Sequence, residues 1–237
     1  MGEPAGIGPE VAADTYASFD GHIGGRPLML VGDPEVFQSC ADLPAEAIVP
    51  IKAHAERTPG KLSEANAPAV IEAIALAVRM AMNGEAAAVV TAPIHKAVLM
   101  ATGFKYPGHT DFLAELTGQK RAVMMLASEA LRVVPVTTHV PLCRVPDLLD
   151  TGNIVEIAEI TLAALRRDFG IAKPRLAVAG LNPHAGENGV LGREEIDVIV
   201  PAVEELKKRG HIVLGPLPSD TMFHEEARNR YDAALCM

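Results

Sequence analysis

The stretch Leu176-Ala-Val-Ala-Gly-Leu-Asn-Pro-His184 contains the pattern that decides the fold, an apolar run that leads directly into a polar cluster. The pattern recurs twice: the run 131–136 leads into Thr137-Thr138-His139, and the run 212–214 leads into Pro218-Ser219-Asp220. In open α/β sheets, ligands bind beyond the carboxyl ends of the strands. The polar clusters are therefore expected to converge on one crevice.

Helical segments alternate with these apolar runs. Apolar residues recur at helical spacing between residues 70 and 82, and Asn83-Gly84 supplies a C-terminal stop. Further helices are expected at 110–116, 154–168 and 193–209, and further strands at 87–90 and 122–126. This alternation predicts a parallel or mixed sheet with covering helices. A boundary between two lobes is expected near residue 108.

Both ends of the sequence indicate a chain cut from a longer fold. The chain opens on the glycine-rich turn of residues 2–8, which leads into a helix with no strand before it, although a βα unit begins with its strand. It ends on Asp232-Ala-Ala-Leu-Cys-Met237, which reads as a strand with no loop after it. We expect residues 1–237 to be one two-lobed unit that lacks its C-terminal part, so that a site requiring the next loop would be incomplete.

Composition excludes several classes of protein. With 237 residues, 49% of them hydrophobic, the chain can bury a sizeable core. Its net charge of -9, without a basic stripe, argues against a nucleic-acid surface. The most apolar stretch, residues 68–82, includes Glu72 and Arg79, which favours a buried helix over a membrane span.

The three cysteines, Cys40, Cys143 and Cys236, are widely separated. Their number and spacing fit neither a disulfide framework nor a zinc ribbon. A reducing cytoplasm is the expected location.

Four loops combine glycine, proline, threonine and histidine near strand ends. They are Thr91-Ala-Pro-Ile-His-Lys96, Pro107-Gly-His-Thr110, Thr137-Thr-His-Val-Pro141 and Leu181-Asn-Pro-His-Ala-Gly-Glu187. A histidine next to proline or glycine is held by a stiff backbone, which suits a ligand or an acid/base group. A single loop histidine more often has a surface or capping role, but four such loops together favour a functional site.

His139 and His184 are the best metal candidates, because imidazole suits zinc and similar divalent ions. A catalytic metal commonly has three protein ligands, so Asp220, His224 or a residue after Met237 would have to complete the set. Asp220 has an alternative role, as the cap of a following helix through the amides near Phe223.

Two further features are less specific. Lys96 could hold a phosphate or a carboxylate, although an exposed lysine is usually solvated. The glycines of residues 2–8 lack both the Walker lysine and the GxGxxG spacing, and taken alone they indicate a plain turn before a helix.

Six motifs, taken in order, resemble the 4-hydroxythreonine-4-phosphate dehydrogenase family. They are Gly2-Glu-Pro-Ala-Gly-Ile-Gly-Pro-Glu10, Thr91-Ala-Pro-Ile-His-Lys96, Gly108-His-Thr-Asp-Phe-Leu113, Thr138-His-Val-Pro-Leu142, Gly180-Leu-Asn-Pro-His-Ala-Gly-Glu187 and Gly215-Pro-Leu-Pro-Ser-Asp-Thr221. The resemblance implies a two-lobed α/β/α fold like that of the isocitrate and isopropylmalate dehydrogenases, with a parallel or mixed sheet. It also implies a homodimer with its active site in the cleft.

The resemblance further implies a reaction. The family oxidises 4-phosphooxy-L-threonine with NAD or NADP and a divalent cation (Zn, Mg, Co or Mn), and the β-keto acid then loses carbon dioxide to give 3-amino-2-oxopropyl phosphate, a step in vitamin B6 (pyridoxal 5'-phosphate) biosynthesis. Carried over by motif, His109 and Thr110 would contact the substrate, and His139 and His184 would bind the metal. Asp220, beside the metal, and Lys96 are the expected catalytic residues.

The sequence departs from the family pattern at two places. The family's third metal histidine lies in a Tyr-His-Asp-Gln-Gly stretch after the last strand, and its phosphate-gripping residues follow later; none of these is in the sequence. Glu3 stands where the family more often has Asp.

Three alternatives stay open. Within the family, the substrate could be a four-carbon sugar-acid phosphate, such as threonate or erythronate 4-phosphate, or a cis-dihydrodiol dicarboxylate. Outside it, the chain could be a non-catalytic metal-binding protein on the same fold.

Overall fold

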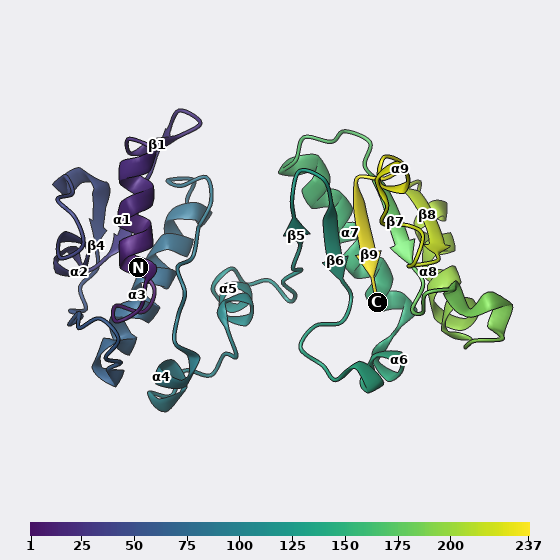
Figure 1. Cartoon of the computed structure of the whole chain (residues 1–237), viewed down its shortest axis with the longest axis horizontal. Coiled ribbons are helices and arrows are strands. Elements are labelled where there is room, and N and C mark those ends of the chain that lie inside the picture. The colour runs from purple at the N-terminus through teal and green to yellow at the C-terminus, as the bar shows by residue number, and fades with distance from the viewer. The chain divides into compact units, whose positions relative to one another are not determined.

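A computed structural model describes all residues from Met1 to Met237 and divides the chain into two compact units, Met1–Ala122 and Val123–Met237 (Figure 1). The division falls later than the boundary expected near residue 108. The reason is that helix α5 (His109–Leu116) buries Phe112 in the core of the first unit, against Val70 and Leu99.

The first unit is mainly helical. Its helices are α1 (Gly8–Ser18), α2 (Pro34–Gln38), α3 (Ala67–Met82), α4 (Lys96–Ala101) and α5, with short 3-10 turns at Ala45–Ala47 and Glu64–Asn66. Its strands form two small pairs, β1 (His22–Ile23) antiparallel to β2 (Arg26–Pro27), and β3 (Leu30–Gly32) parallel to β4 (Ile48–Pro50).

Helix α3 is the main core element of this unit. Pro68 occupies its first turn, where a missing N–H costs no hydrogen bond, and Gly84 follows the C-cap Asn83 with φ of 79°. Residues 64–82 are long and apolar enough to cross a membrane, but the buried face of α3 packs against the unit's own core. The helix is therefore accounted for as a core helix, as the sequence predicts.

The strand expected at 87–90 is wrong. Residues 86–92 run without regular secondary structure, and Val90 is 96% exposed. No strand is hydrogen-bonded to this segment, and a β-strand exists only where a neighbour pairs with its backbone groups.

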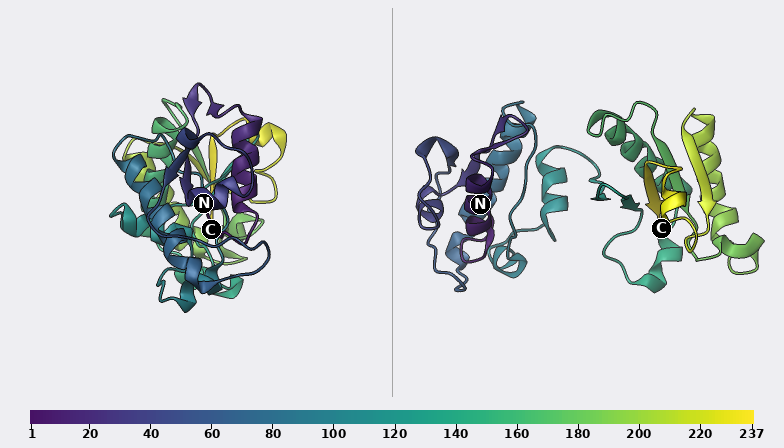
Figure 2. Two further views of the ribbon diagram at one scale, coloured as in Figure 1. Left: turned by 90° about the vertical axis from the view of Figure 1, so that its left-hand side faces the viewer. Right: turned by 45° about the horizontal axis from the view of Figure 1, so that its top comes forward.

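The second unit is built on a five-stranded sheet in the order β5-β6-β9-β7-β8. Its strands are β5 (Leu126–Ala127), β6 (Arg132–Pro135), β7 (Arg175–Ala179), β8 (Ile212–Leu217) and β9 (Ala233–Cys236). All neighbours are parallel except β5, which is antiparallel to β6. The last strand, β9, lies between β6 and β7 and is the yellow arrow in Figure 2.

Helices cover this sheet on one face. These helices are α6 (Val145–Leu148), α7 (Thr151–Arg167) and α8 (Val200–Lys208). The short helix α9 (Glu225–Arg228) lies in the chain between Phe223 and Tyr231, which pack on the opposite face. Turns of 3-10 helix occur at Leu142–Arg144 and Ala185–Gly189. Leu176 and Val178 of β7 point into the core formed with α7 and α8, whereas Ala177 and Ala179 pack with Met222 and Tyr231 on the other face. This alternation is the expected result of the two-residue period of a strand.

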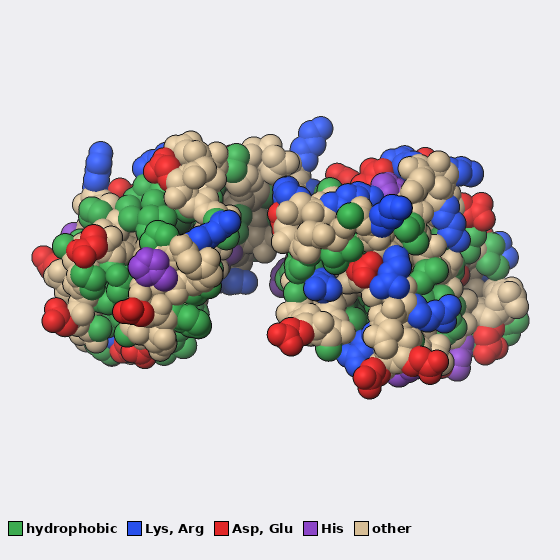
Figure 3. Space-filling model, turned by 90° about the horizontal axis from the view of Figure 1, so that it is seen from above, with side chains coloured by type: hydrophobic (Ala, Val, Ile, Leu, Met, Phe, Trp, Pro, Cys, Tyr) green, Lys and Arg blue, Asp and Glu red, His purple; other side chains and the backbone are tan.

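Two expected elements have different bounds. The helix expected at 193–209 begins as a π-helical turn, Glu195–Ile199, before α8. The strand expected at 122–126 is reduced to the two residues of β5, because β6 pairs with it only there. On the face shown in Figure 3, Lys and Arg side chains gather over the second unit, with Asp and Glu side chains mostly around them.

Candidate active site

The carboxyl ends of β7 and β8 bring His184 and Asp220 together. His184 Nδ1 lies 3.6 Å from Asp220 Oδ2, and both side chains are partly open to solvent. The pairing follows from the sheet, since β7 and β8 are parallel neighbours and their following loops leave the same edge. The expectation that polar clusters converge here is met by these two loops.

Hydrogen bonds within the loop and from the next strand fix the loop that carries His184. Asn182 Oδ1 accepts from the backbone N–H groups of His184 (2.9 Å) and Gly186 (3.1 Å). Ser219 Oγ lies 3.2 Å from the carbonyl oxygens of Gly180 and Asn182 and can donate to either. The β8 loop thus holds the β7 loop next to its own Asp220.

Asp220 does not cap a helix. Helix α9 begins at Glu225, and its cap is His224, whose Nδ1 accepts from the N–H of Ala227 at 3.4 Å. The capping role considered for Asp220 is therefore wrong, and His224 has a local role at the helix terminus.

His139 follows β6, on the other side of β9. Its backbone adopts φ of 58°, a conformation that few non-glycine residues adopt. Thr137 Oγ1 donates to the carbonyl of Met237 at 2.9 Å, so the β6 loop contacts the end of β9. No group of three His, Cys, Asp or Glu side chains gathers in the structure, and His139 has no ion pair with Asp220.

A second group of predicted residues lies in the first unit, around the start of α5. His109 is the first residue of that helix, and the exposed Thr110 follows it. Lys96 Nζ lies near the backbone of Gly108, since a Cβ there would be 3.5 Å from it. The side chain of His95 caps α4, accepting from Val98 N–H at 3.4 Å, which leaves Lys96 at the first position of the helix.

His109 has an unusual environment. Its Nε2 is buried and has no hydrogen-bond partner. Burial, followed by the positive charges of Lys96 and the Met1 amino group, lowers the pKa of His109 below its ordinary value. The imidazole is thus neutral near pH 7, with one nitrogen to donate and one to accept.

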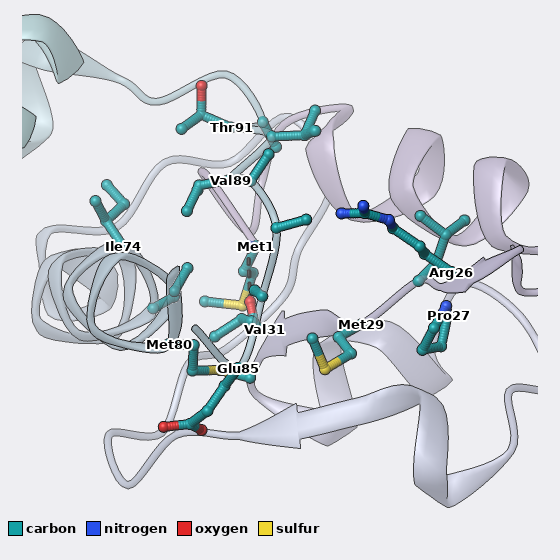
Figure 4. Close-up of a pocket in the computed structure, with 18 of the residues that line it drawn as sticks. Met1, Arg26, Pro27, Met29, Val31, Ile74, Met80, Glu85, Val89 and Thr91 are labelled. Atoms are coloured by element: carbon teal, nitrogen blue, oxygen red, sulfur yellow. Dashed lines mark hydrogen bonds between the residues drawn. The ribbon is translucent and has the colours of Figure 1, made fainter. Parts of the chain in front are cut away.

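His109 also lies on the wall of a cavity of about 720 Å³. Figure 4 labels other residues of its lining, such as Met1 and Met80. The lining is largely apolar and includes Val31 and Ile74. The Met1 amino group donates to the carbonyl of Val31 at 2.8 Å, and burial lowers the pKa of this amino group to about 6.

Comparison with known proteins decides the family. The family described as "Pyridoxal phosphate biosynthetic protein PdxA" matches residues 26–237. The chain belongs to this family. Membership makes it an oxidoreductase of the dehydrogenase type, connected with pyridoxal phosphate biosynthesis.

Several curated relatives of this chain are named 4-hydroxythreonine-4-phosphate dehydrogenase. The one from Paracoccus denitrificans is 48% identical over 99% of this chain and 76% of its own length, and one from Caulobacter vibrioides is 44% identical over 100% and 77%. A solved 4-hydroxythreonine-4-phosphate dehydrogenase from Klebsiella pneumoniae has a TM-score of 0.86 and 32% identity, covering 100% of this chain and 77% of that one. The two-lobed α/β fold class is confirmed.

Sequence reasoning missed two buried carboxylates that each keep one oxygen without a partner. They are Glu3 and Glu195, which are only 5% and 3% exposed. Glu3 Oε1 accepts from the N–H of Ala5 at 3.1 Å, and Glu195 Oε1 accepts from the N–H of Leu181 at 2.8 Å. Neither has a local signal of burial, because acidic side chains are mostly exposed wherever they lie in the chain.

Proposed function

We propose that this PdxA protein oxidises the secondary alcohol of 4-phosphooxy-L-threonine with NAD or NADP and a divalent cation. The β-keto acid then loses carbon dioxide to give 3-amino-2-oxopropyl phosphate, in vitamin B6 biosynthesis. The observation that carries the proposal is the 48% identity with the Paracoccus denitrificans dehydrogenase over 99% of the chain.

The paired loops of the second unit suit a metal. His184 and Asp220 supply an imidazole nitrogen and a carboxylate oxygen 3.6 Å apart, both of which are common ligands of divalent ions. His184, with His139 as a further ligand, would hold Zn, Mg, Co or Mn, and Asp220 would lie beside the ion. When bound, such an ion supplies Lewis acidity that lowers the pKa of a substrate hydroxyl and stabilises the negative charge left by decarboxylation.

The chain's own groups have separate tasks in this scheme. Neutral His109, with Thr110 beside it, contacts the substrate through hydrogen bonds that an imidazolium could not accept. Lys96 supplies a positive charge for the phosphate or the carboxylate of the substrate. Asp220 holds His184 in place and offers a carboxylate that can take up a proton.

Steady-state assays test the proposal. We expect the protein at the full length of its curated relatives to reduce NAD or NADP with 4-phosphooxy-L-threonine; this chain covers 76% of the Paracoccus denitrificans enzyme. The activity should require a divalent cation, should exceed that with threonate 4-phosphate, and should be weaker or absent in residues 1–237 alone. His184→Ala removes a proposed metal ligand. The matched control is His211→Ala, which removes a histidine elsewhere in the same unit, 3.8 Å from Glu159. Absence of nicotinamide reduction with every substrate, despite metal uptake, would instead support a non-catalytic metal-binding protein.

A second substrate class has one observation in its favour. A terephthalate 1,2-cis-dihydrodiol dehydrogenase from Burkholderia xenovorans has a TM-score of 0.71 and 29% identity with this chain. Both values are lower than those of the Klebsiella pneumoniae enzyme, at 0.86 and 32%, so the amino-acid phosphate is the preferred substrate. A cis-dihydrodiol dicarboxylate belongs in the same assay, and its preference by the enzyme would reverse this choice.

We also propose that the protein is a cytoplasmic homodimer. The three cysteines form no disulfide, as suits a reducing compartment. Light scattering during gel filtration measures the assembly, and a monomer at micromolar concentration would contradict it.

A further inference from the structure

Glu195 is the one buried carboxylate of the second unit. It opens the π-helical turn before α8 and is 3% exposed. One oxygen, Oε1, accepts from the N–H of Leu181 at 2.8 Å, and the other, Oε2, is buried without a partner. Burial of a carboxylate is costly, so a group placed here needs a reason.

The loop that carries His184 is built around this carboxylate. A Cβ on Gly180 would lie 3.0 Å from Glu195 Oε1, and a Cβ on Gly186 would lie 2.6 Å from Oε2. Gly186 also has φ of 74°, which glycine adopts without strain. Gly186 therefore leaves room for the Glu195 side chain, and Gly180 leaves room for both Ala185 and Glu195.

Contacts on the other side of the loop come from the loop after β8. Ser219 Oγ reaches the carbonyls of Gly180 and Asn182, so Glu195 and Ser219 hold the same few backbone atoms from two directions. A bond from a backbone N–H to a carboxylate is stronger than one to a neutral oxygen. The backbone of Leu181 is thereby fixed, and His184 lies three residues further along the chain.

We propose that Glu195 is a positioning residue for His184. Its carboxylate fixes the backbone at Leu181 and packs against Gly186, and so sets where the His184 imidazole meets Asp220 and a divalent cation. This inference rests on the proposed metal role of His184. Glu195 would not touch the ion itself but would orient one of its ligands, as residues next to metal ligands do in many proteins.

The test is a Zn²⁺ titration followed on the NMR signals of the His184 side chain, with hydrogen exchange measured at the amides of 181–186. In Glu195→Ala, which removes the acceptor, we expect Zn²⁺ affinity to fall about 10- to 100-fold and these amides to exchange faster. Glu195→Gln keeps an acceptor for Leu181 N–H, so we expect it to recover most of the affinity.

A matched control separates positioning from general stability. Leu206 of α8 is fully buried in the same unit, and Leu206→Ala should destabilise the fold by about 2–5 kcal/mol. Under conditions where both variants are folded, Leu206→Ala should keep the Zn²⁺ affinity of the wild type.

Three results would overturn the inference. If the wild type binds Zn²⁺ and Glu195→Ala binds it with the same affinity, Glu195 has no positioning role. The proposed function is then unaffected. If Leu206→Ala loses as much Zn²⁺ affinity as Glu195→Ala, Glu195 has only a structural role. No Zn²⁺ binding at His184 in the wild type removes the metal assignment itself, and the positioning role with it.

Discussion

At the scale of the residue, the positive charge of Lys96 contributes to the lowered pKa of His109. Burial is the larger cause of the lowered pKa of His109, and Lys96 is the next. Lys96→Met should therefore raise the pKa of His109 without restoring the ordinary value of about 6.5. An NMR titration of the imidazole signals measures this pKa.

Lys105→Met is the matched control, because the Lys105 charge is not among those that act on His109. An unchanged pKa of His109 in Lys96→Met would disprove the coupling.

The same shift has a consequence for stability. The folded pKa of His109 lies below the unfolded value, so between the two values the unfolded chain binds more protons. The free energy of unfolding should therefore rise as the pH rises through this window, and His109 should destabilise the fold at more acid pH.

At the scale of the element, α5 depends on an aromatic cluster. The Phe112 ring lies 5.0 Å from Phe104 and 5.1 Å from Tyr106, centroid to centroid, and Phe112 is 6% exposed. Phe112→Ala should cost about 3–5 kcal/mol of stability and loosen the helix that starts at His109. Denaturant unfolding measures the cost, and hydrogen exchange along residues 109–116 measures the loosening.

A second phenylalanine gives the control for this prediction. Phe19, at the end of α1, is 54% exposed, and Phe19→Ala should change stability by no more than about 0.5 kcal/mol. Equal losses in the two variants would mean that the cluster does not anchor α5.

At the scale of the whole molecule, the two units have separate cores. The clusters of the first unit contain only residues before Ala122, and those of the second contain only residues after it. We therefore expect residues 123–237, produced alone, to keep their parallel sheet, and Phe112→Ala to leave amide exchange in that unit unchanged. Circular dichroism and NMR spectra of the fragment check the first point. A disordered fragment would show that its stability depends on the first unit.

The sequence alone determined the fold class, the approximate bounds of the longer helices and those of the main strands of the second unit, but none of the short strands of residues 22–50. The apolar runs that form β6, β7, β8 and β9 lie where they were predicted, and α3 and α7 match the helical periodicity within a few residues. These features depend on local patterns, which a chain carries in its order of residues. The family followed from six motifs, and the comparisons confirm it.

Only the tertiary structure decided which of the predicted residues meet. The order β6-β9-β7-β8 brings His184 to Asp220 and leaves His139 across β9. The absence of a paired neighbour leaves residues 86–92 out of any sheet, and the packing of residues 180–186 makes Glu195 a buried carboxylate. Strand order, strand pairing and the burial of Glu195 all depend on contacts between residues that are distant in the sequence. No local pattern of residues encodes such contacts.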